Sequence, residues 1–335
     1  MTRQISNVSL TAARLPGKPV APRTWLLSWE AARTLATLGG RMTAFLFATF
    51  LLVQFATSAS PMSALPTLSM AVLALIAAFA RRGSMAALSV GYVVSFIVFA
   101  NLRPFADSAG MPVQFDYTIQ LERLGFFGTL PSAWLQRHFY VPGRVTPLEM
   151  LSATTYVTYF AAPHLAAILA WRLKPALFPR VVIVISLSLL LGLVLYFLVP
   201  TAPPWLASDT GRTETVHRVM PELTSHVSKQ SYSESSEAIG KNDVAAMPSL
   251  HMALTVVVGL TAARFGRVGT WLGRLYMAMM ALALVYLGEH YVVDEVAGLA
   301  FALAVWWAVF NYERLIAWAR RLRQPGRSMS PISEL

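Results

Sequence analysis

Eight apolar runs constrain this chain more than any other feature of its sequence. Each spans 16 to 20 residues, the length that an α-helix needs to cross a hydrocarbon core of about 30 Å at about 1.5 Å per residue. The pattern predicts an all-α, polytopic membrane protein with about eight transmembrane helices. The first run is the weakest, because it is short and contains Gln54. The predicted spans are 42–58, 63–80, 85–101, 152–171, 181–199, 249–264, 271–288 and 291–310.

The distribution of charge predicts the orientation of these spans. Segments 1–41, 81–84, 172–180, 264–274 and 311–335 alternate to one side of the membrane and hold 19 of the 27 Lys and Arg residues. The positive-inside rule makes this side cytoplasmic. We therefore expect both termini in the cytoplasm, and no nucleic-acid partner despite the net charge of +11. The short Arg- and Ala-rich loops favour a bacterial inner membrane.

Two longer segments then lie on the outer face. Residues 102–150 are rich in aromatics, and Phe115, Ile119 and the Phe126–Phe127 pair alternate with polar residues. This spacing predicts a helical segment lying in the membrane interface. Residues 206–247 are rich in Ser, Thr and Glu, which predicts a mobile or lid-like loop.

Three short motifs fall on that same outer face. PTAPPW begins at Pro200 where the fifth predicted span ends, MPSLH runs from Met247 to His251 where the sixth begins, and YLGEHYVVDEVAG contains His290 and Asp294 between the last two spans. The three helix ends meet at one depth if the helices form a bundle. The topology therefore predicts one polar site at the outer end of the bundle.

The chemistry of this site follows from its residue types. His290 and Asp294 are four residues apart, so on a helix the carboxylate stacks beside the imidazole, orients its tautomer and leaves one nitrogen free as a base or nucleophile. Pro248 suits the first turn of a helix. The N–H groups of Ser249 and Leu250, together with the Ser249 hydroxyl, then form a cradle for an anion, with His251 at its rim. Two imidazoles around an anion site are typical of phosphoryl transfer without a metal.

With these motifs in place, the sequence resembles the type 2 phosphatidic acid phosphatase superfamily, and within it the branch of inositol phosphorylceramide synthase and its bacterial relatives. MPSLH is similar to the second motif of the superfamily and HYVVD to the third, while PTAPPW is similar to that branch's version of the first. The likeness covers 181–311 well and 102–171 loosely. It implies a six-helix catalytic membrane domain over 85–311. The hydropathy and charge patterns add two accessory helices in 42–84 and basic cytoplasmic tails at 1–41 and 312–335.

The resemblance also implies roles for single residues: His290 as the nucleophile that forms a phosphohistidine, Asp294 as its orienting acid, His251 as general acid and base, and Ser249 as a phosphate ligand. It implies no metal and no cofactor.

Two departures from the superfamily pattern leave the phosphate-binding cation open. Phe96 stands where a lysine precedes the Arg103–Pro104 pair, and Leu284 stands where the third motif carries an arginine. Lys241 is the first candidate, followed by Arg212, Arg218 and Arg103. Pro200, Thr201, Trp205, Asn242 and Glu289 are candidates for lining the site. PTAPPW has an equal claim as a helix terminator with an interfacial tryptophan. Glu289 is more typical of a solvated loop charge, and His138, His164, His217 and His226 of ordinary packing or solvated side chains.

Several functions share this chemistry. Transfer of the phosphoryl group to an alcohol makes a lipid phosphotransferase with a polyol or lipid acceptor, which the PTAPPW and MPSLH motifs and the aromatic segment favour. Transfer to water makes a phosphatase acting on lipid phosphates or polyprenyl diphosphates. A metal-dependent enzyme built on the two histidines and neighbouring acids is a different class, and so is a transporter. The clustering of polar residues at one interface disfavours the transporter.

Overall fold

The computed structural model describes residues 85–106, 110–227, 242–314 and 316. This part of the chain is helical and contains no strand, only two isolated backbone bridges. The prediction of an all-α bundle is confirmed. The predicted tail 1–41 and the spans 42–58 and 63–80 lie outside the described residues, as does most of the tail 312–335. The helices are α3 (Met85–Leu102), the 3-10 turn η1 (Arg103–Ala106), α4 (Asp116–Gly125), α5 (Pro131–Phe139), α6 (Pro147–Thr158), α7 (Ala162–Leu173), α8 (Phe178–Leu198), α9 (Pro204–Asp209), α10 (Val219–Val227), α12 (Leu250–Ala263), α13 (Arg267–Tyr286) and α14 (Val292–Phe310).

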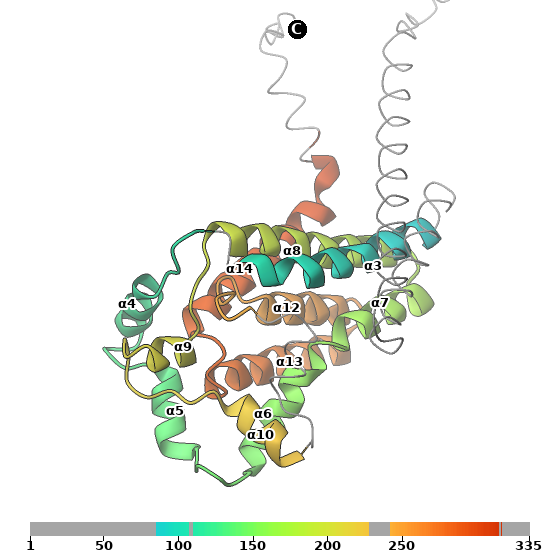
Figure 1. Cartoon of the computed structure of the whole chain (residues 1–335). Helices are drawn as coiled ribbons and strands as arrows, with labels where there is room; N and C mark the ends of the chain where they lie inside the picture. Colours follow the sequence, from blue (N-terminus) through green and yellow to red (C-terminus); the bar gives the residue numbers. More distant parts are fainter. Residues whose placement is uncertain (1–84, 107–109, 228–241, 315, 317–335) are drawn as a thin grey trace, which may run out of the picture.

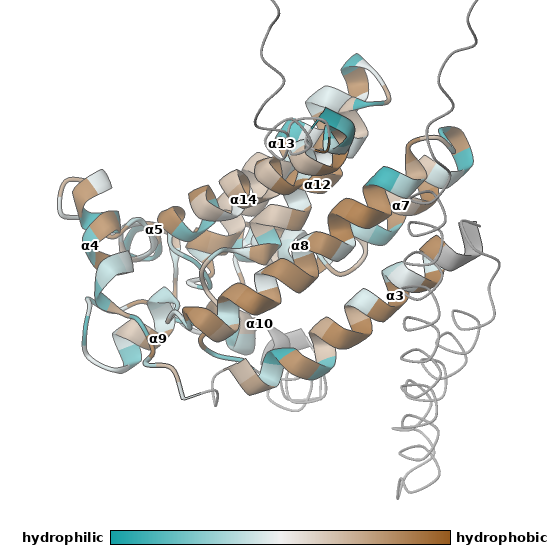
Figure 2. Cartoon of the chain, turned by 90° about the horizontal axis from the view of Figure 1, so that it is seen from above, coloured by the Kyte–Doolittle hydropathy of each residue, from teal (hydrophilic) through white to brown (hydrophobic). Residues whose placement is uncertain are grey.

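Four stretches within the described residues are long and apolar enough to cross a membrane. They are Leu88–Ala106, which covers most of α3 and η1, and the whole of α8, α13 and α14. The long helices α3, α8, α12, α13 and α14 run side by side (Figure 1), and their residues are largely hydrophobic (Figure 2). The chain is therefore an integral membrane protein.

Helix α12 occupies the middle of this bundle and packs against α7, α8, α13 and α14. Ala253, Leu254, Val256 and Val257 on α12 are fully buried. Since α12 is buried on nearly every side, the chain that leads into it is held between its neighbours. This position brings His251, in the first turn of α12, to the inside of the bundle.

The fourth predicted span, 152–171, is wrong as a single helix. The structure has two helices, α6 and α7, interrupted at Tyr159–Ala161. Pro163 lies in the first turn of α7. Proline has no backbone N–H to donate, and in a continuous helix its ring would clash with the carbonyl four residues earlier. The proline thus ends one helix and begins the next.

The outer segments are more ordered than the sequence predicts. Helices α4, α5 and α9 gather at one end of the bundle (Figure 1), beside the turn from α13 to α14. Helix α4 forms within the segment where an interfacial helix is predicted; Ile119 on it is buried in the protein, while Phe127 after the helix is fully exposed. The prediction of a mobile loop is wrong for residues 206–227, because Ala207, Val216 and Val219 are buried against the bundle.

Candidate active site

The start of α12 differs from its prediction. The helix begins at Leu250, Ser249 is its N-cap, and Pro248 therefore precedes the first turn. The Ser249 hydroxyl accepts a hydrogen bond from the Met252 N–H at 3.2 Å, as N-cap serines do. The Ser249 N–H donates to the backbone carbonyl of Asp294 at 3.1 Å. The predicted cradle is thus wrong for Ser249, since its N–H joins α12 to α14 and is not free for an anion.

The third motif also folds differently in detail. His290 precedes α14, and Tyr291 is the N-cap of that helix, so His290 and Asp294 do not stack along one helix. The carboxylate of Asp294 reaches back from the first turn and accepts a hydrogen bond from the Tyr291 N–H at 3.0 Å, as acids at this helix position do. The same oxygen lies 3.6 Å from Nδ1 of His290. The Asp294 carboxylate therefore lies beside Nδ1 of His290, because its side chain turns back toward the residues that precede α14.

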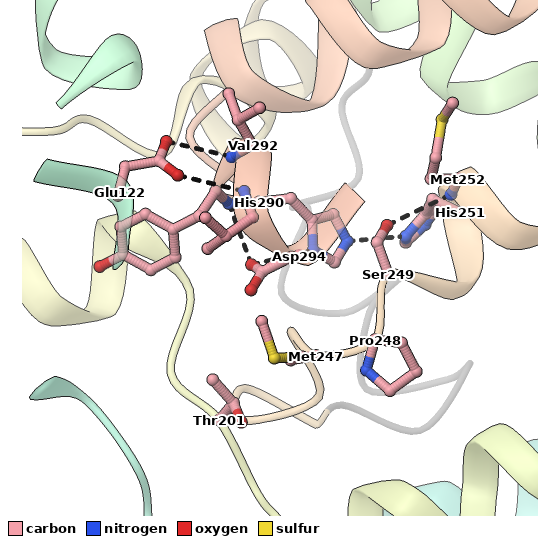
Figure 3. Close-up of polar contacts among 12 residues, drawn as sticks. Glu122, Thr201, Met247, Pro248, Ser249, His251, Met252, His290, Val292 and Asp294 are labelled. Carbon is pink, nitrogen blue, oxygen red and sulfur yellow. Dashed lines mark hydrogen bonds and ion pairs between the residues drawn. The ribbon is translucent and has the colours of Figure 1, made fainter. Parts of the chain in front are cut away.

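The two histidines of the second and third motifs meet. Nδ1 of His251, in the first turn of α12, lies 3.2 Å from Nε2 of His290, which precedes α14 (Figure 3). The ring of His251 also packs on the rings of Tyr156 and Tyr159, with centroids 4.9 and 4.2 Å away. If His290 carries its proton on Nδ1, facing Asp294, then Nε2 holds a lone pair and His251 is the donor between the rings. This is the proton arrangement of an imidazole ready to act as a nucleophile.

A cavity of about 180 Å³ opens beside His251, the histidine of the pair that lines it. Its wall is mostly aromatic and comes from α3, the α6–α7 break, α8 and the start of α12. Arg103 and Phe96 both line it together with His251 and Leu250. From the sequence, Arg103 was the last of the candidate cations. The bundle nevertheless brings Arg103 to the cavity that His251 lines.

The other candidate cations are engaged elsewhere or lie outside the described residues, as Lys241 does. Arg212 pairs with Asp116 at 3.2 Å. Arg218 pairs with Glu289 at 3.0 Å and with Asp243 at 3.6 Å. The expectation of a solvated Glu289 is wrong, because its carboxylate is buried in this ion pair beside His290.

The PTAPPW segment forms a junction of main-chain atoms. Pro200 accepts a hydrogen bond from the Gln114 N–H at 2.8 Å, and Thr201 exchanges backbone hydrogen bonds with Val244 and Ala246 at 2.7 and 3.1 Å. These bonds join three segments that are distant in the sequence, and the last of them directly precedes the MPSLH motif. They support a structural role for the PTAPPW segment.

The five residues expected to line the site lie outside the wall of the cavity beside His251; they are Pro200, Thr201, Trp205, Asn242 and Glu289. The ring of Trp205 packs under the guanidinium of Arg218, at 4.2 Å. Asn242 donates from its side-chain amide to the Arg103 carbonyl at 2.6 Å, so it fixes the backbone that carries Arg103. Their contribution to the site is therefore one of support.

Helix α4 contributes side chains that the sequence analysis overlooked. Glu122 is fully buried, and its carboxylate accepts hydrogen bonds from the N–H groups of Val292 and Val293 at 3.0 and 3.1 Å (Figure 3). Burial raises the pKa of Glu122, against the lowering effect of these two bonds. The signal in the sequence was a charged residue three positions after Ile119, on the apolar face of an amphipathic helix.

Tyr117, one residue into α4, shares a hydrogen bond with the Thr201 hydroxyl at 2.8 Å. Burial also raises the pKa of Tyr117 and of Tyr291, and the nearby carboxylate of Asp294 raises both further. Both phenols therefore stay neutral at physiological pH.

Of the remaining histidines, His138 and His217 are exposed, in agreement with their prediction as solvated side chains. His164 accepts or donates a hydrogen bond with the Tyr92 hydroxyl at 2.8 Å and also lines the cavity. It therefore combines packing with a place on the cavity wall. The side chain of His226 lies outside the described part of the structure.

Comparison with known proteins agrees with this geometry. The family model described as PAP2 superfamily matches residues 121–308, more than half of the chain, including both histidines and Asp294. Searches of curated proteins and of solved structures found no match. The chain therefore belongs to the PAP2 superfamily, whose members are phosphatases and phosphotransferases.

Proposed function

We propose that this protein is a lipid phosphotransferase that acts at the extracytoplasmic face of the membrane through a phosphohistidine at His290. The observation that carries the proposal is the 3.2 Å approach of the two imidazoles at an aromatic cavity, with a carboxylate behind one of them. This arrangement supplies a nucleophile, an orienting acid and a second proton carrier, which together suffice for double displacement at phosphorus.

In the first half-reaction, the phosphoryl group of a phospholipid enters between the two imidazoles and replaces their hydrogen bond. Nε2 of His290 attacks phosphorus, the bond from phosphorus to the lipid alcohol breaks, and the departing oxygen takes a proton from His251, which enters this step as the imidazolium and leaves it neutral. The proton on Nδ1 of His290 stays in place, and Asp294 compensates the positive charge that the ring gains.

In the second half-reaction, the acceptor hydroxyl gives its proton to His251 and its oxygen attacks phosphorus. The bond from phosphorus to Nε2 breaks, and both imidazoles return to their starting protonation states. The same residue thus serves as acid and then as base, as microscopic reversibility requires.

The phosphate also needs a positive partner. Arg103 is the best-supported candidate among the described cations, because it lines the cavity with His251 and its backbone is held by Asn242. Lys241 remains a candidate from its position in the sequence, seven residues before Pro248. Leu250, which lines the cavity, completes the phosphate site at the N-terminus of α12, where the helix dipole favours an anion.

An alcohol acceptor is favoured over water by the character of the cavity. Tyr156, Tyr159 and Phe160 line the cavity, so the second substrate meets an aromatic wall. This supports the branch of inositol phosphorylceramide synthase-like transferases, which the PTAPPW and MPSLH motifs also resemble. A lipid phosphatase shares every step up to the phosphoenzyme, and the products decide between the two.

The charge pattern of the loops supports cytoplasmic termini and a bacterial inner membrane as the setting. In this organisation residues 85–311 form the catalytic domain, residues 42–84 add two accessory helices, and the tails 1–41 and 312–335 lie in the cytoplasm. The lipid substrate then approaches from the outer leaflet.

The test is incubation of the purified protein with a panel of labelled phospholipids, with and without inositol and ceramide, while free phosphate and new lipid products are followed together. A new phospholipid in the presence of an acceptor supports the transferase, and free phosphate alone supports the phosphatase. His290→Ala is expected to abolish turnover and the acid-labile phosphoenzyme. His138→Ala, at an exposed histidine, is the matched control and should behave as wild type. Wild-type turnover by His290→Ala would overturn the mechanism.

A further inference from the structure

Glu122 is a buried acid for which the phosphotransfer steps above have no use. It lies on α4, a short helix between η1 and α5, and its neighbours Leu121 and Arg123 are exposed. A carboxylate without solvent is costly unless hydrogen bonds compensate it. Its nearest acids, Asp294 and Glu295, increase that cost, since like charges repel. Such a departure from ordinary packing is expected where function requires it.

The two partners of Glu122 identify its role. They are the N–H groups of Val292 and Val293, the first two residues of α14. The first N–H groups of a helix have no partner within the helix and need an acceptor from outside. The N-cap residue of α14 is Tyr291, and a tyrosine lacks the short side-chain oxygen that usually supplies this acceptor. Glu122 therefore caps α14 from a separate helix.

This cap determines what Asp294 is free to do. Asp294 lies in the same first turn of α14, and its carboxylate is the other acceptor at this helix end, bonded to the Tyr291 N–H. Without Glu122, two further N–H groups and the positive end of the helix dipole would attract the Asp294 carboxylate. The oxygen that faces Nδ1 of His290 at 3.6 Å would then move away from the imidazole. With Glu122 in place, the Asp294 carboxylate stays beside Nδ1 of His290.

We propose that Glu122 is a positioning residue: its carboxylate caps α14 and thereby holds Asp294 behind the nucleophilic imidazole of His290. The proposal rests on the phosphohistidine function proposed above and adds a second acid, supplied by α4, to the nucleophile's support. Glu122 touches neither substrate nor the reacting atoms in this scheme and acts only through α14 and Asp294.

The kinetic test compares Glu122→Gln with wild type on the lipid that the panel identifies. Glutamine keeps the size of the side chain but presents only one acceptor oxygen, so one N–H of α14 loses its partner. We expect kcat to fall about tenfold or more, with KM changed by less than about twofold, because the loss concerns the nucleophile and not substrate binding. Asp116→Asn removes an exposed carboxylate from the same helix and is the matched control, with unchanged kinetics.

A double-mutant cycle separates positioning from a general structural role. If Glu122 acts through Asp294, Glu122→Gln should have little further effect on kcat in an Asp294→Asn background. A full additional tenfold loss in that background would show that the two acids act independently and would overturn the proposal. If Glu122→Gln does not fold, Glu122→Asp, which keeps the charge but has a shorter reach, takes its place in the cycle.

Hydrogen exchange tests the cap without any activity measurement. The amides of Val292 and Val293 should exchange at least about tenfold faster in Glu122→Gln, and at the wild-type rate in Asp116→Asn. Unchanged exchange in Glu122→Gln would refute the cap. An inactive wild type with faster exchange in Glu122→Gln would overturn the proposed function and leave the cap supported. An active wild type with normal kcat in Glu122→Gln would support the proposed function and overturn the positioning role of Glu122.

Discussion

The distance between α12 and α14 at Gly298 provides the sharpest test of the site's geometry. Gly298 lies one turn after Asp294, and a Cβ atom at this position would stand 2.3 Å from the carbonyl oxygen of Ser249. That oxygen belongs to the main chain, so no side-chain rotation relieves the clash. In Gly298→Ala the two helices must separate by about 1 Å to restore ordinary van der Waals contact.

The displacement acts directly on the histidine pair. His251 follows Ser249 by two residues on α12, and His290 is tied to the start of α14. A misplacement of about 1 Å between reacting groups can lower a rate by about a hundredfold. We therefore expect Gly298→Ala to lower kcat by about that factor, and to lower the free energy of unfolding by about 1–3 kcal/mol, which is typical of overpacking.

The assay is the initial rate of phosphoryl transfer to the product found with the lipid panel, measured well below the unfolding temperature of each variant in detergent. Gly91→Ala on α3 is the control, because a Cβ atom there meets nothing within 4 Å. It should retain wild-type kcat and gain up to about 1 kcal/mol of stability from the better helix propensity of alanine. If Gly298→Ala retains kcat within threefold of wild type, the spacing of α12 and α14 does not control the histidine pair, and the reasoning is refuted.

Three further outcomes are expected. Asp294→Asn should lower kcat on the order of a hundredfold or more and reduce the phosphoenzyme formed in a rapid quench, because an amide cannot hold the Nδ1 proton of His290 as a carboxylate does; normal phosphoenzyme formation would contradict this role. The protein should keep full activity in excess chelator and be inhibited by vanadate, whereas loss of activity restored by zinc would favour a metal-dependent enzyme. The chain has no cysteine, so a single one introduced at the exposed Asp209 should react with a membrane-impermeant maleimide in intact cells. Reaction only after lysis would reverse the proposed topology.

The sequence predicts the membrane helices well because hydropathy and length follow directly from the bilayer. The runs at 85–101, 181–199 and 291–310 agree with α3, α8 and α14 to within three residues at each end. The break between α6 and α7 was missed although Pro163 is visible in the sequence. Membrane spans tolerate prolines when neighbouring helices satisfy the freed backbone groups, so a proline alone does not distinguish a kink from a helix end.

The site was predictable where its residues belong to compact motifs. His251, His290 and Asp294 stand at characteristic spacings in short segments, and the structure brings the two rings together. From the sequence, Arg103 was ranked last among the candidate cations and Glu122 was overlooked. Their positions in the structure depend on how the ends of α3 and α4 pack against helices more than a hundred residues later in the chain. The Ser249 N–H was wrongly expected to be free for the same reason: its acceptor is the carbonyl of Asp294, a contact between helices that no local pattern encodes.

The junction at Thr201 has a consequence for how relatives of this chain can diverge. Its hydrogen bonds to Val244, Ala246 and the Gln114 segment join main-chain atoms, so most substitutions there leave the joint intact, and a proline at Ala246 would break it by removing the donor. Relatives can therefore diverge in the side chains along this junction while its main-chain bonds continue to guide the chain into the MPSLH motif and His251.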